Sequence, residues 1–291
     1  MDEKVNISVV MTAYNAEATI GDAIESVLNQ SYPYFEFIIV DDGSTDETRN
    51  IIQCYKDPRI RLVQNKHNYI GSLNIGIALA KGKFIARMDA DDVMLRDRLK
   101  IQYAILEQYE EITVCSAFCK VIGNNVTPGL MADSYSGLIK NPLPLLLRRN
   151  FIYHPTTMIR KAFLYKHQIR YNQDYIYAED YAMWVEIVQN GGILYVEPQP
   201  LIYYRLSNHQ MGNIHKQEQI LASQKIQIEI INTLIAKETD SRNKRSLSNL
   251  LSDLLQVEAV NYIQRESIIH LFSKITTVPL KWTNRSLKSL K

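Results

Sequence analysis

Residues 83–92 read Lys-Phe-Ile-Ala-Arg-Met-Asp-Ala-Asp-Asp, and this stretch decides the fold class. The run from Lys83 to Met88 predicts a buried strand that leads directly into three carboxylates. Open α/β folds bind ligands at the carboxyl ends of their strands, so the acidic loop is expected at that edge. Clustered carboxylates favour a hard divalent cation that also binds substrate phosphates. A solvated acidic turn that caps the next helix stays open as the alternative, with Asp97 just beyond.

A second acidic loop follows an earlier strand-like run. Residues 34–40, which are apolar except for Glu36, are followed by Asp41-Asp42-Gly43-Ser44-Thr45-Asp46. Parallel strands end at one edge of a sheet, so Asp42 and Asp91 are expected to face the same ligand. A carboxylate at Asp42 could accept a hydrogen bond from a nucleobase N–H or a ribose hydroxyl. Asp46 is expected to cap the helix that follows.

The first 120 residues alternate between strand and helix patterns. Strands are expected at residues 6–12, 35–40, 60–63 and 83–88, and helices at 20–28, from 47 and at 72–80. This β-α alternation predicts an α/β fold with a mostly parallel sheet, covered on both faces and joined by right-handed crossovers.

Composition and charge limit the class of protein. With 291 residues, 46% of them hydrophobic, the chain can form one large α/β domain with an appendage. The net charge of +2 provides no bulk field for nucleic acid, which is not expected as a partner. The start of the chain lacks a signal-peptide pattern and no apolar run reaches membrane-spanning length, so a cytoplasmic or peripheral membrane location is expected. Cys54, Cys115 and Cys119 are expected to be packing residues in a reducing compartment.

The turn after the first strand argues against a dinucleotide-binding dehydrogenase. Residues 12–17 read Thr-Ala-Tyr-Asn-Ala-Glu, without the Gly-x-Gly-x-x-Gly fingerprint, and a Walker A motif is also absent. Phosphate groups would therefore have to be held by a metal and by side chains.

A third acidic pair, Glu179-Asp180, opens a predicted helix with Trp184 on its inner face. Carboxylates in a first helical turn are favoured by the helix dipole, but a transferase also needs a base near the attacking hydroxyl. His154, in His-Pro-Thr-Thr, would either contact an acceptor or phosphate or pack as a hydrogen-bonded histidine.

Together, four ordered motifs resemble those of family 2 glycosyltransferases. They are residues 8–15, residues 37–46, residues 74–82 leading into Asp89-Ala90-Asp91-Asp92, and Glu179-Asp180. The resemblance runs from about residue 6 to 210. It implies the GT-A fold for residues 1–210, with a donor half of about 1–120 and an acceptor half of about 121–210. Residues 211–291 would form a helical extension.

The resemblance also implies an activity. Such an enzyme transfers a sugar from a nucleotide diphosphate to a glycan or lipid-linked acceptor, with inversion and with Mn²⁺ or Mg²⁺, as in surface polysaccharide synthesis. UDP-sugars are favoured, while GDP- and dTDP-sugars stay open. Asp180 would be the general base with Glu179 beside it, and Asp91, Asp89 and His209 would bind metal. His154 and Trp184 would lie near the acceptor. The donor nucleotide would contact Thr12, Ala13, Tyr14, Asn15, Asp42, Asn74, Asp89 and Ala90.

Several alternatives remain open from the sequence. His209 could be an exposed loop residue. The basic, amphipathic end of the chain, which contains Trp282, could rest on an anionic membrane or pack on the catalytic domain or a second copy in a homo-oligomer. A nucleotidyltransferase and a non-catalytic sugar-nucleotide-binding protein are the other functional classes considered.

Overall fold

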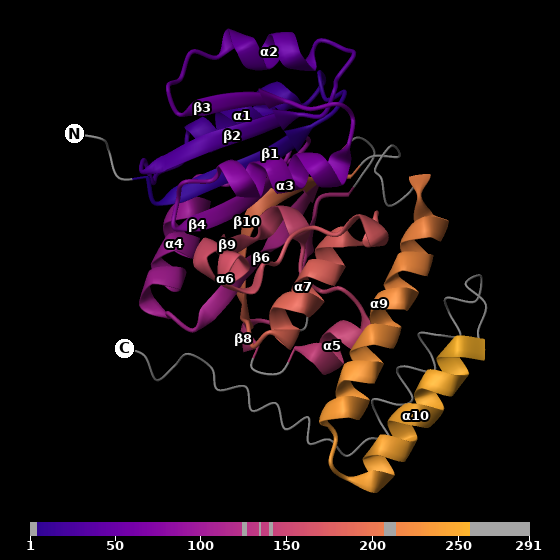
Figure 1. Cartoon of the computed structure of the whole chain (residues 1–291). Helices are drawn as coiled ribbons and strands as arrows, with labels where there is room; N and C mark the ends of the chain where they lie inside the picture. The colour runs from indigo at the N-terminus through magenta and orange to yellow at the C-terminus, as the bar shows by residue number, and fades with distance from the viewer. Residues whose placement is uncertain (1–4, 124–126, 134, 140–141, 207–213, 257–291) are drawn as a thin grey trace. The chain divides into compact units, whose positions relative to one another are not determined.

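The computed structural model describes residues 5–123, 127–133, 135–139, 142–206 and 214–256 (Figure 1). The chain divides into two compact units, Met1–Gln227 and Ile228–Lys291. The predicted domain division near residue 210 stays a prediction.

The first unit is built on a ten-stranded mixed sheet. Its strands follow the order β3-β2-β1-β4-β9-β6-β10-β5, while β7 pairs with β6 and β8 pairs with β10. The strands are β1 (Ile7–Ala13), β2 (Phe35–Asp41), β3 (Ile60–Gln64), β4 (Phe84–Asp89), β5 (Val93–Met94), β6 (Ile112–Ile122), β7 (Gly129–Met131), β8 (Gly137–Ile139), β9 (Met158–Arg160) and β10 (Ile193–Arg205).

Helices connect and cover these strands. The first unit contains α1 (Ile20–Leu28), α2 (Thr48–Cys54), α3 (Tyr69–Leu79), α4 (Arg98–Gln108), α5 (Leu143–Arg148), α6 (Lys161–His167) and α7 (Glu179–Gln189), with short 3₁₀ turns η1 (His154–Thr156) and η2 (Gln173–Tyr175). Helix α9 (Lys216–Lys237) crosses from the first unit into the second, which continues with α10 (Ser241–Gln256). The predicted helical character of this C-terminal part is confirmed for the described residues.

Both faces of β1 are buried. Its alternate residues Ile7, Val9, Met11 and Ala13 belong to one apolar core with the inner face of α1. On the opposite face, Val10 meets Gly76 of α3 so closely that a Cβ atom at Gly76 would lie 2.2 Å from Val10 Cγ1. The predicted α/β class, with a sheet covered by helices, is therefore confirmed.

The central strand β9 interrupts the parallel order of the sheet. Strands β3, β2, β1 and β4 run parallel to one another, as predicted, and β6 runs parallel to β10. Strand β9 lies antiparallel between β4 and β6. The sheet is thus parallel from β3 to β4 and mixed overall.

A buried arginine connects this central part to α4. Arg98 is fully buried, and its Nη2 donates to the carbonyl oxygens of Arg87 (2.8 Å) and Thr157 (3.1 Å), while its Nε donates to Gln102 Oε1 (3.0 Å). Burial lowers the pKa of Arg98 to about 9. Because these acceptors lie on β4, next to β9 and on α4, the side chain fixes the strand that carries the acidic loop.

Two local predictions need correction. Helix α3 begins at Tyr69, three residues before the predicted Ser72, because the Asn68 side chain caps it by accepting a hydrogen bond from the Gly71 N–H (3.0 Å). Cys115 and Cys119 are buried as expected, but Cys54 is exposed at the end of α2 and is not a packing residue.

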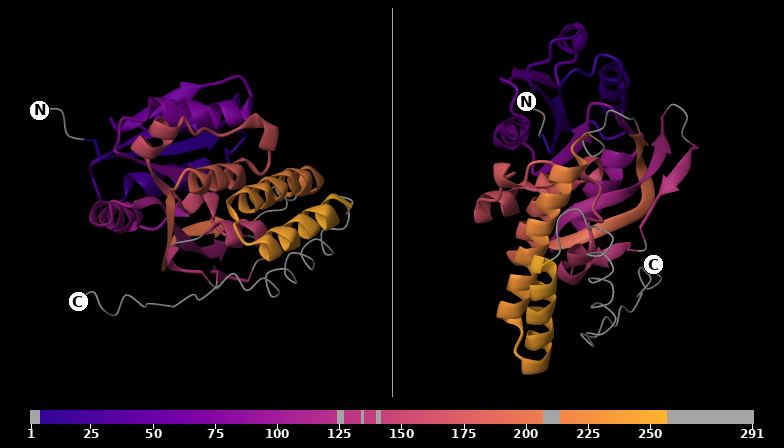
Figure 2. Two further views of the ribbon diagram at one scale, coloured as in Figure 1. Left: turned by 60° about the horizontal axis from the view of Figure 1, so that its bottom comes forward. Right: turned by 90° about the vertical axis from the view of Figure 1, so that its right-hand side faces the viewer.

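The second unit is a helical pair. Residues 228–237 of α9 lie beside α10 in both views of Figure 2, and Ile230, Ile231, Leu247 and Leu250 are buried.

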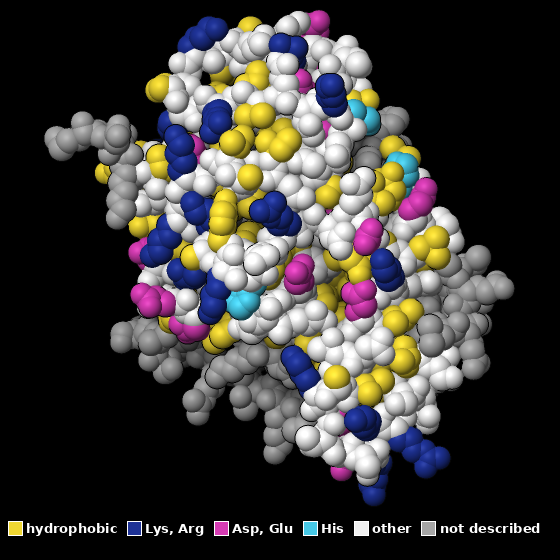
Figure 3. Space-filling model, in the orientation of Figure 1, with side chains coloured by type: hydrophobic (Ala, Val, Ile, Leu, Met, Phe, Trp, Pro, Cys, Tyr) yellow, Lys and Arg dark blue, Asp and Glu magenta, His cyan; other side chains and the backbone are white. Residues whose placement is uncertain are grey.

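Among the helices of the described residues, none combines the length and apolar character needed to cross a membrane. On the face shown in Figure 3, basic side chains are spread out with acidic and apolar side chains between them.

Candidate active site

Three carboxylates gather where β4 ends. One side-chain oxygen from each of Asp89, Asp91 and Asp92 lies within 4.8 Å of the others. Asp92 is buried, and its Oδ1 accepts a hydrogen bond from the Arg205 N–H (2.8 Å). Its Oδ2 is also buried but has no hydrogen-bond partner among the described residues. An all-oxygen donor set with one buried oxygen left unsatisfied fits a hard divalent cation such as Mg²⁺ or Mn²⁺.

The electrostatics of this cluster agree with that fit. Burial and the charge of Asp89 raise the pKa of Asp91 to about 6, and the same causes raise the pKa of Asp92 well above its ordinary value. Arg205 partly offsets the effect on Asp91, and its Nε donates to the Asp91 carbonyl oxygen (2.7 Å). Three negatively charged carboxylates in one partly buried cluster repel one another, and a bound cation would relieve this repulsion.

A buried guanidinium lies beside the same cluster. The Arg87 side chain is 3% exposed and forms an ion pair with Asp89 through Nη1. Its Nη2 lies 3.5 Å from the Tyr69 hydroxyl, whereas its Nε has no hydrogen-bond partner within the part of the chain that is described. The ion pair holds the Asp89 carboxylate in one orientation.

The third acidic pair begins α7. Asp180 is partly exposed, and its two carboxylate oxygens accept from Asn150 Nδ2 (2.9 Å) and from the Tyr181 N–H (2.6 Å). Glu179 is buried, with no hydrogen-bond partner for its Oε2 among the residues described. Burial raises the pKa of Asp180 to about 6, and burial together with the Asp180 charge raises that of Glu179 to about 7.

The two acidic groups share one electrostatic environment although about 90 positions separate them in the sequence. The charge of Asp89 contributes to the raised pKa of Asp180, and the nearby Arg87 guanidinium acts in the opposite direction on Asp180 and on Glu179. The sequence-based expectation of a shared edge concerned Asp42 and Asp91, whereas this coupling joins Asp89 to Asp180.

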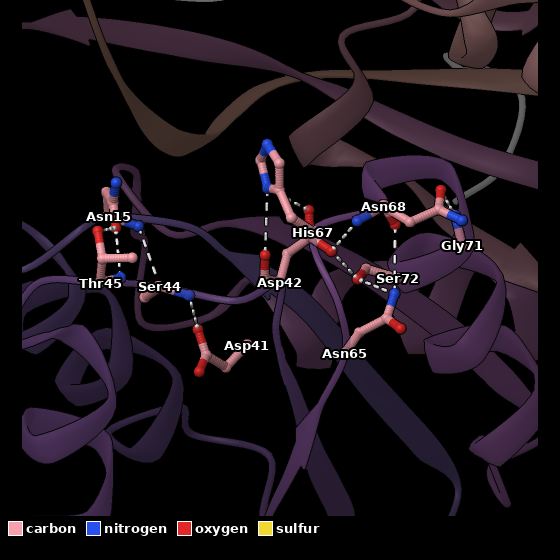
Figure 4. A network of polar contacts seen from close by, with 10 residues as sticks. All are labelled: Asn15, Asp41, Asp42, Ser44, Thr45, Asn65, His67, Asn68, Gly71 and Ser72. Carbon is pink, nitrogen blue, oxygen red and sulfur yellow. Dashed lines mark hydrogen bonds and ion pairs between the residues drawn. The ribbon is translucent and has the colours of Figure 1, made fainter.

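Asp42 is the centre of a separate polar network (Figure 4). Its Oδ1 accepts from the Asn68 N–H (2.7 Å) and from Ser72 Oγ (2.6 Å), and Ser72 Oγ in turn accepts from Asn65 Nδ2 (3.0 Å). The Nδ1 atom of His67 lies 3.2 Å from the Asp42 carbonyl oxygen and 3.5 Å from Oδ2. The network ties the end of β2 to the start of α3.

The loop after β1 lies next to this network. Thr12 is buried opposite Asp89 in the β1–β4 register, and the Ala13 carbonyl oxygen accepts from the Asp42 N–H (2.8 Å). Asn15 Oδ1 accepts from the Thr45 N–H (2.9 Å), which joins the two loops. Tyr14 is 45% exposed, and its ring centroid lies 4.1 Å from that of His67. The structure thus brings these predicted donor residues together, while their roles stay predictions.

The comparison with protein families matches residues 8–169, more than half of the chain, to glycosyl transferase family 2. The chain belongs to this family. Its membership favours a glycosyltransferase over the nucleotidyltransferase and non-catalytic alternatives.

Relatives of this glycosyltransferase carry similar descriptions. An uncharacterized glycosyltransferase of Haemophilus influenzae is 34% identical over 283 residues, which cover 92% of this chain and 86% of the relative. A relative in Escherichia coli is named UDP-Glc:alpha-D-GlcNAc-diphosphoundecaprenol beta-1,3-glucosyltransferase WfgD; it is 29% identical over 197 residues, covering 64% of this chain and 71% of WfgD.

The solved structures show the fold. TarS of S. aureus, residues 1–349 in complex with UDP-GlcNAc, superimposes with a TM-score of 0.67 at 18% identity, covering 92% of this chain and 80% of TarS. This likeness confirms the predicted GT-A fold for the glycosyltransferase.

Two further predicted donor residues of the glycosyltransferase, Asn74 and Ala90, also make contacts within the protein, and their roles stay predictions. Asn74 donates to the Tyr171 carbonyl oxygen (2.8 Å) and accepts from the Tyr171 N–H (3.0 Å), which binds α3 to the segment before α7. The Ala90 carbonyl oxygen accepts from the Thr19 hydroxyl (3.0 Å). Asp97 lies outside the acidic cluster, and its Oδ1 accepts from Ser31 Oγ (2.6 Å).

The predicted acceptor residues form an aromatic group. His154 is partly buried, with its Nε2 2.7 Å from the Tyr171 hydroxyl and its ring 6.1 Å from that of Trp184. Burial and the Arg87 charge lower the pKa of His154 well below its ordinary value. Trp184 is fully buried, and its Nε1 has no partner among the described residues. Contact with an acceptor stays a prediction, and His209 lies outside the described residues.

Sequence reasoning did not assign a role to several residues at the site. Asn150 and Tyr171 come from segments without a motif, and no pattern in their surroundings marks them. Asp92 belongs to the quoted acidic motif, yet among its carboxylates only Asp89 and Asp91 were expected to bind metal. The position of Asp92 directly after Asp91 is the sequence feature that could have indicated this third carboxylate.

Proposed function

We propose that this enzyme transfers a sugar from a nucleotide diphosphate donor, with UDP-sugars favoured, to a hydroxyl of a glycan or lipid-linked glycan, with inversion at the anomeric carbon. The observation that carries the proposal is the electrostatic coupling between the acidic cluster and the start of α7. The charge of Asp89 acts on Asp180, and the buried Arg87 acts on both Glu179 and Asp180. The UDP-GlcNAc complex of TarS and the UDP-Glc and diphosphoundecaprenol in the name of WfgD support the choice of donor and acceptor.

Asp180 is the proposed general base. Its carboxylate is partly exposed, and Asn150 and the Tyr181 N–H fix its orientation. With a pKa of about 6 it is mostly ionised at neutral pH, yet basic enough to take the proton of an attacking hydroxyl. Direct attack by that hydroxyl on the anomeric carbon inverts its configuration, so one base is sufficient.

The leaving diphosphate requires compensation of its charge. Asp91, Asp89 and Asp92 would hold Mg²⁺ or Mn²⁺, and the bound cation would supply positive charge to compensate the charge that develops on the diphosphate. Arg87 orients Asp89 through their ion pair. Thr12 to Asn15 and Asp42 would bind the nucleoside.

The proposal also covers the location of the enzyme and its assembly. The basic C-terminal tail would bring the enzyme to an anionic membrane surface where lipid-linked acceptors are found, or would join a second copy. The tail residues that carry this idea lie outside the described part of the chain.

The test separates donor binding from turnover. Thermal unfolding is measured with UDP, GDP, dTDP and CDP, each with Mn²⁺ or with EDTA, for the native chain, Asp91→Ala and Asp180→Asn. We expect a nucleotide shift that needs both metal and Asp91 and that Asp180→Asn retains. Sugar transfer or hydrolysis by Asp180→Asn should fall by about 10²- to 10⁴-fold. Native turnover in Asp180→Asn would contradict the assignment of the base.

A further inference from the structure

His67 covers the only Asp42 carboxylate oxygen that the network leaves free. Oδ1 of Asp42 already accepts from the Asn68 N–H and Ser72 Oγ, whereas Oδ2 faces Nδ1 of His67 at 3.5 Å. The Asp42 side chain is 3% exposed and that of His67 is 65% exposed. A ligand that bonds to Oδ2 would therefore compete with the imidazole.

The imidazole makes the contacts that a nucleobase would make. Its ring lies 4.1 Å from the Tyr14 ring at an interplanar angle of 31°, so the two aromatic rings pack face to face with a tilt. Its Nδ1 points at two acceptors of Asp42, the carbonyl oxygen and Oδ2, so the favourable tautomer has a proton on Nδ1. A flat ring that stacks on a tyrosine and offers an N–H to an aspartate has the chemistry of a base with an N–H on its pairing edge.

We propose that His67 occupies the nucleobase position of the donor site and that the base of the incoming nucleotide displaces its imidazole. This inference rests on the proposed function, because it assumes that Asp42 binds the base. After displacement, Tyr14 stacks on the base and Asp42 Oδ2 accepts the N–H of the base.

The backbone around His67 permits this exchange. The loop stays fixed by the Asn68 N–H and by Ser72, neither of which depends on the imidazole. The ring can move into solvent because most of its surface is already exposed. His67 has a φ of 24°, in the left-handed region that is unfavourable for a residue with a side chain. The displacement therefore needs a side-chain rotation and no rebuilding of the loop.

The number of Asp42 carboxylate oxygens that are available to a ligand also determines which class of nucleobase fits. A carboxylate oxygen accepts about two hydrogen bonds, so Oδ1 is saturated and Oδ2 alone is available. Uracil and thymine offer one N–H, at N3, which matches one free oxygen. Cytosine has an unprotonated N3. Guanine presents its N1–H and N2–H groups side by side, an arrangement that pairs with both oxygens of one carboxylate, and Oδ1 of Asp42 is already occupied. The geometry therefore selects donors that carry uracil or thymine.

The experiment measures nucleotide affinity by calorimetry in the full-length chain with Mn²⁺. His67→Ala should bind UDP about 3- to 10-fold more tightly than the native protein, because the base no longer competes with an internal aromatic contact. His167→Ala is the matched control, because His167 also packs on an aromatic ring, Phe163 (4.4 Å), but lies on α6. Its UDP affinity should be unchanged. The native protein should bind UDP and dTDP more tightly than GDP and CDP.

Nuclear magnetic resonance gives a direct readout. The ring protons of His67, assigned by their absence in His67→Ala, should lose the ring-current shift caused by Tyr14 when UDP is added. Equal or weaker UDP binding by His67→Ala, or unchanged His67 signals in the complex, would overturn the displacement. CDP or GDP binding as tight as UDP binding would overturn the base selection. If the folded native and His67→Ala proteins both bind no nucleotide, the proposed function fails, and this inference fails with it.

Discussion

Asp180 determines the pH dependence expected of the reaction. Burial raises its pKa to about 6, and a general base acts only when it is ionised. We therefore expect kcat to be constant above about pH 7 and to fall about tenfold for each pH unit well below pH 6. The measurement is kcat at saturating donor and acceptor between pH 5 and 8.

A substitution at Asn150 tests whether Asp180 determines the pH profile of kcat. Its amide donates to Asp180 Oδ2 at 2.9 Å and lowers the pKa of the carboxyl. Asn150→Ala should therefore move the acidic limb of the kcat profile to higher pH. A limb that stays in place would show that Asp180 does not control it.

Glu179 is expected to reduce the stability of the folded protein at alkaline pH. Its pKa rises from 4.5 to about 7 in the fold, because it is buried and lies beside Asp180. A carboxyl group whose pKa is raised by folding stabilises the protein below pH 4.5, and this contribution is lost as the pH rises through 7. Glu179→Gln should raise the free energy of unfolding by about 1–3 kcal/mol at pH 8 and little at pH 5.

Urea denaturation at the two pH values measures this difference. Lower activity in the same variant would indicate that the native charge is kept for function at the expense of stability. An equal gain at pH 5 and pH 8 would contradict the electrostatic explanation.

At the scale of elements, the turn from α3 into β4 packs on β1 without space for a side chain. A Cβ atom at Gly82 would lie 2.6 Å from the Ile7 carbonyl carbon and the Ser8 nitrogen, which are backbone atoms. The Gly82 N–H also donates to Ser8 Oγ (2.8 Å). Gly82→Ala should therefore lower the free energy of unfolding by about 1–3 kcal/mol.

The control for this variant is Gly129→Ala in β7. The nearest atom to a Cβ there is the Thr127 carbonyl oxygen, at 3.9 Å. Chemical denaturation of both variants should show a loss for Gly82→Ala only. Equal stabilities would mean that the turn can move away from β1.

The strands and helices that could be predicted are those whose own residues show a clear hydrophobic pattern. Strands β1, β2 and β4 consist mostly of buried apolar residues, and α1 shows the three- and four-residue spacing of a buried face. Strand β9 has only three residues, and it is fixed by antiparallel pairing with distant strands. Strand β10 contains Pro198 and Pro200 and shifts its register against β6 beside them. Such long-range pairing leaves no periodic signal in the sequence.

The candidate site also contains some residues that the sequence predicts and others that it does not. Carboxylates at the ends of strands were predicted to share one edge because parallel topology demands it. Hydrogen-bonding partners such as Asn150 and Tyr171 lie on irregular segments, so their positions follow only from the folded chain. The involvement of His67 depends on a left-handed backbone conformation that its sequence context does not reveal.

For the whole molecule, metal binding should be linked to folding stability. Without metal, stability should fall as the pH rises from about 4 through 6, because burial and Asp89 raise the pKa of Asp91 from 3.8 to about 6. Mn²⁺ should therefore stabilise the protein more at pH 8 than at pH 5, where protons compete for the carboxylates. At 100 times the dissociation constant the gain is about 2.7 kcal/mol.

Thermal unfolding with Mn²⁺ or EDTA tests this linkage. Asp91→Asn should make the metal-free protein more stable at pH 8 and should remove most of the Mn²⁺ effect. A Mn²⁺ effect of native size in Asp91→Asn would place the cation elsewhere.

The exposure of Cys54 makes this protein suitable for single-site chemical labelling. Burial raises the pKa of the Cys115 and Cys119 thiols to about 12, so neither forms the thiolate that reacts with a maleimide. Cys54 is the remaining cysteine, and it lies in solvent at the far end of α2 from the Asp46 loop. One reaction on the native sequence would thus attach a fluorophore to α2, and single-molecule studies could begin without cysteine mutagenesis.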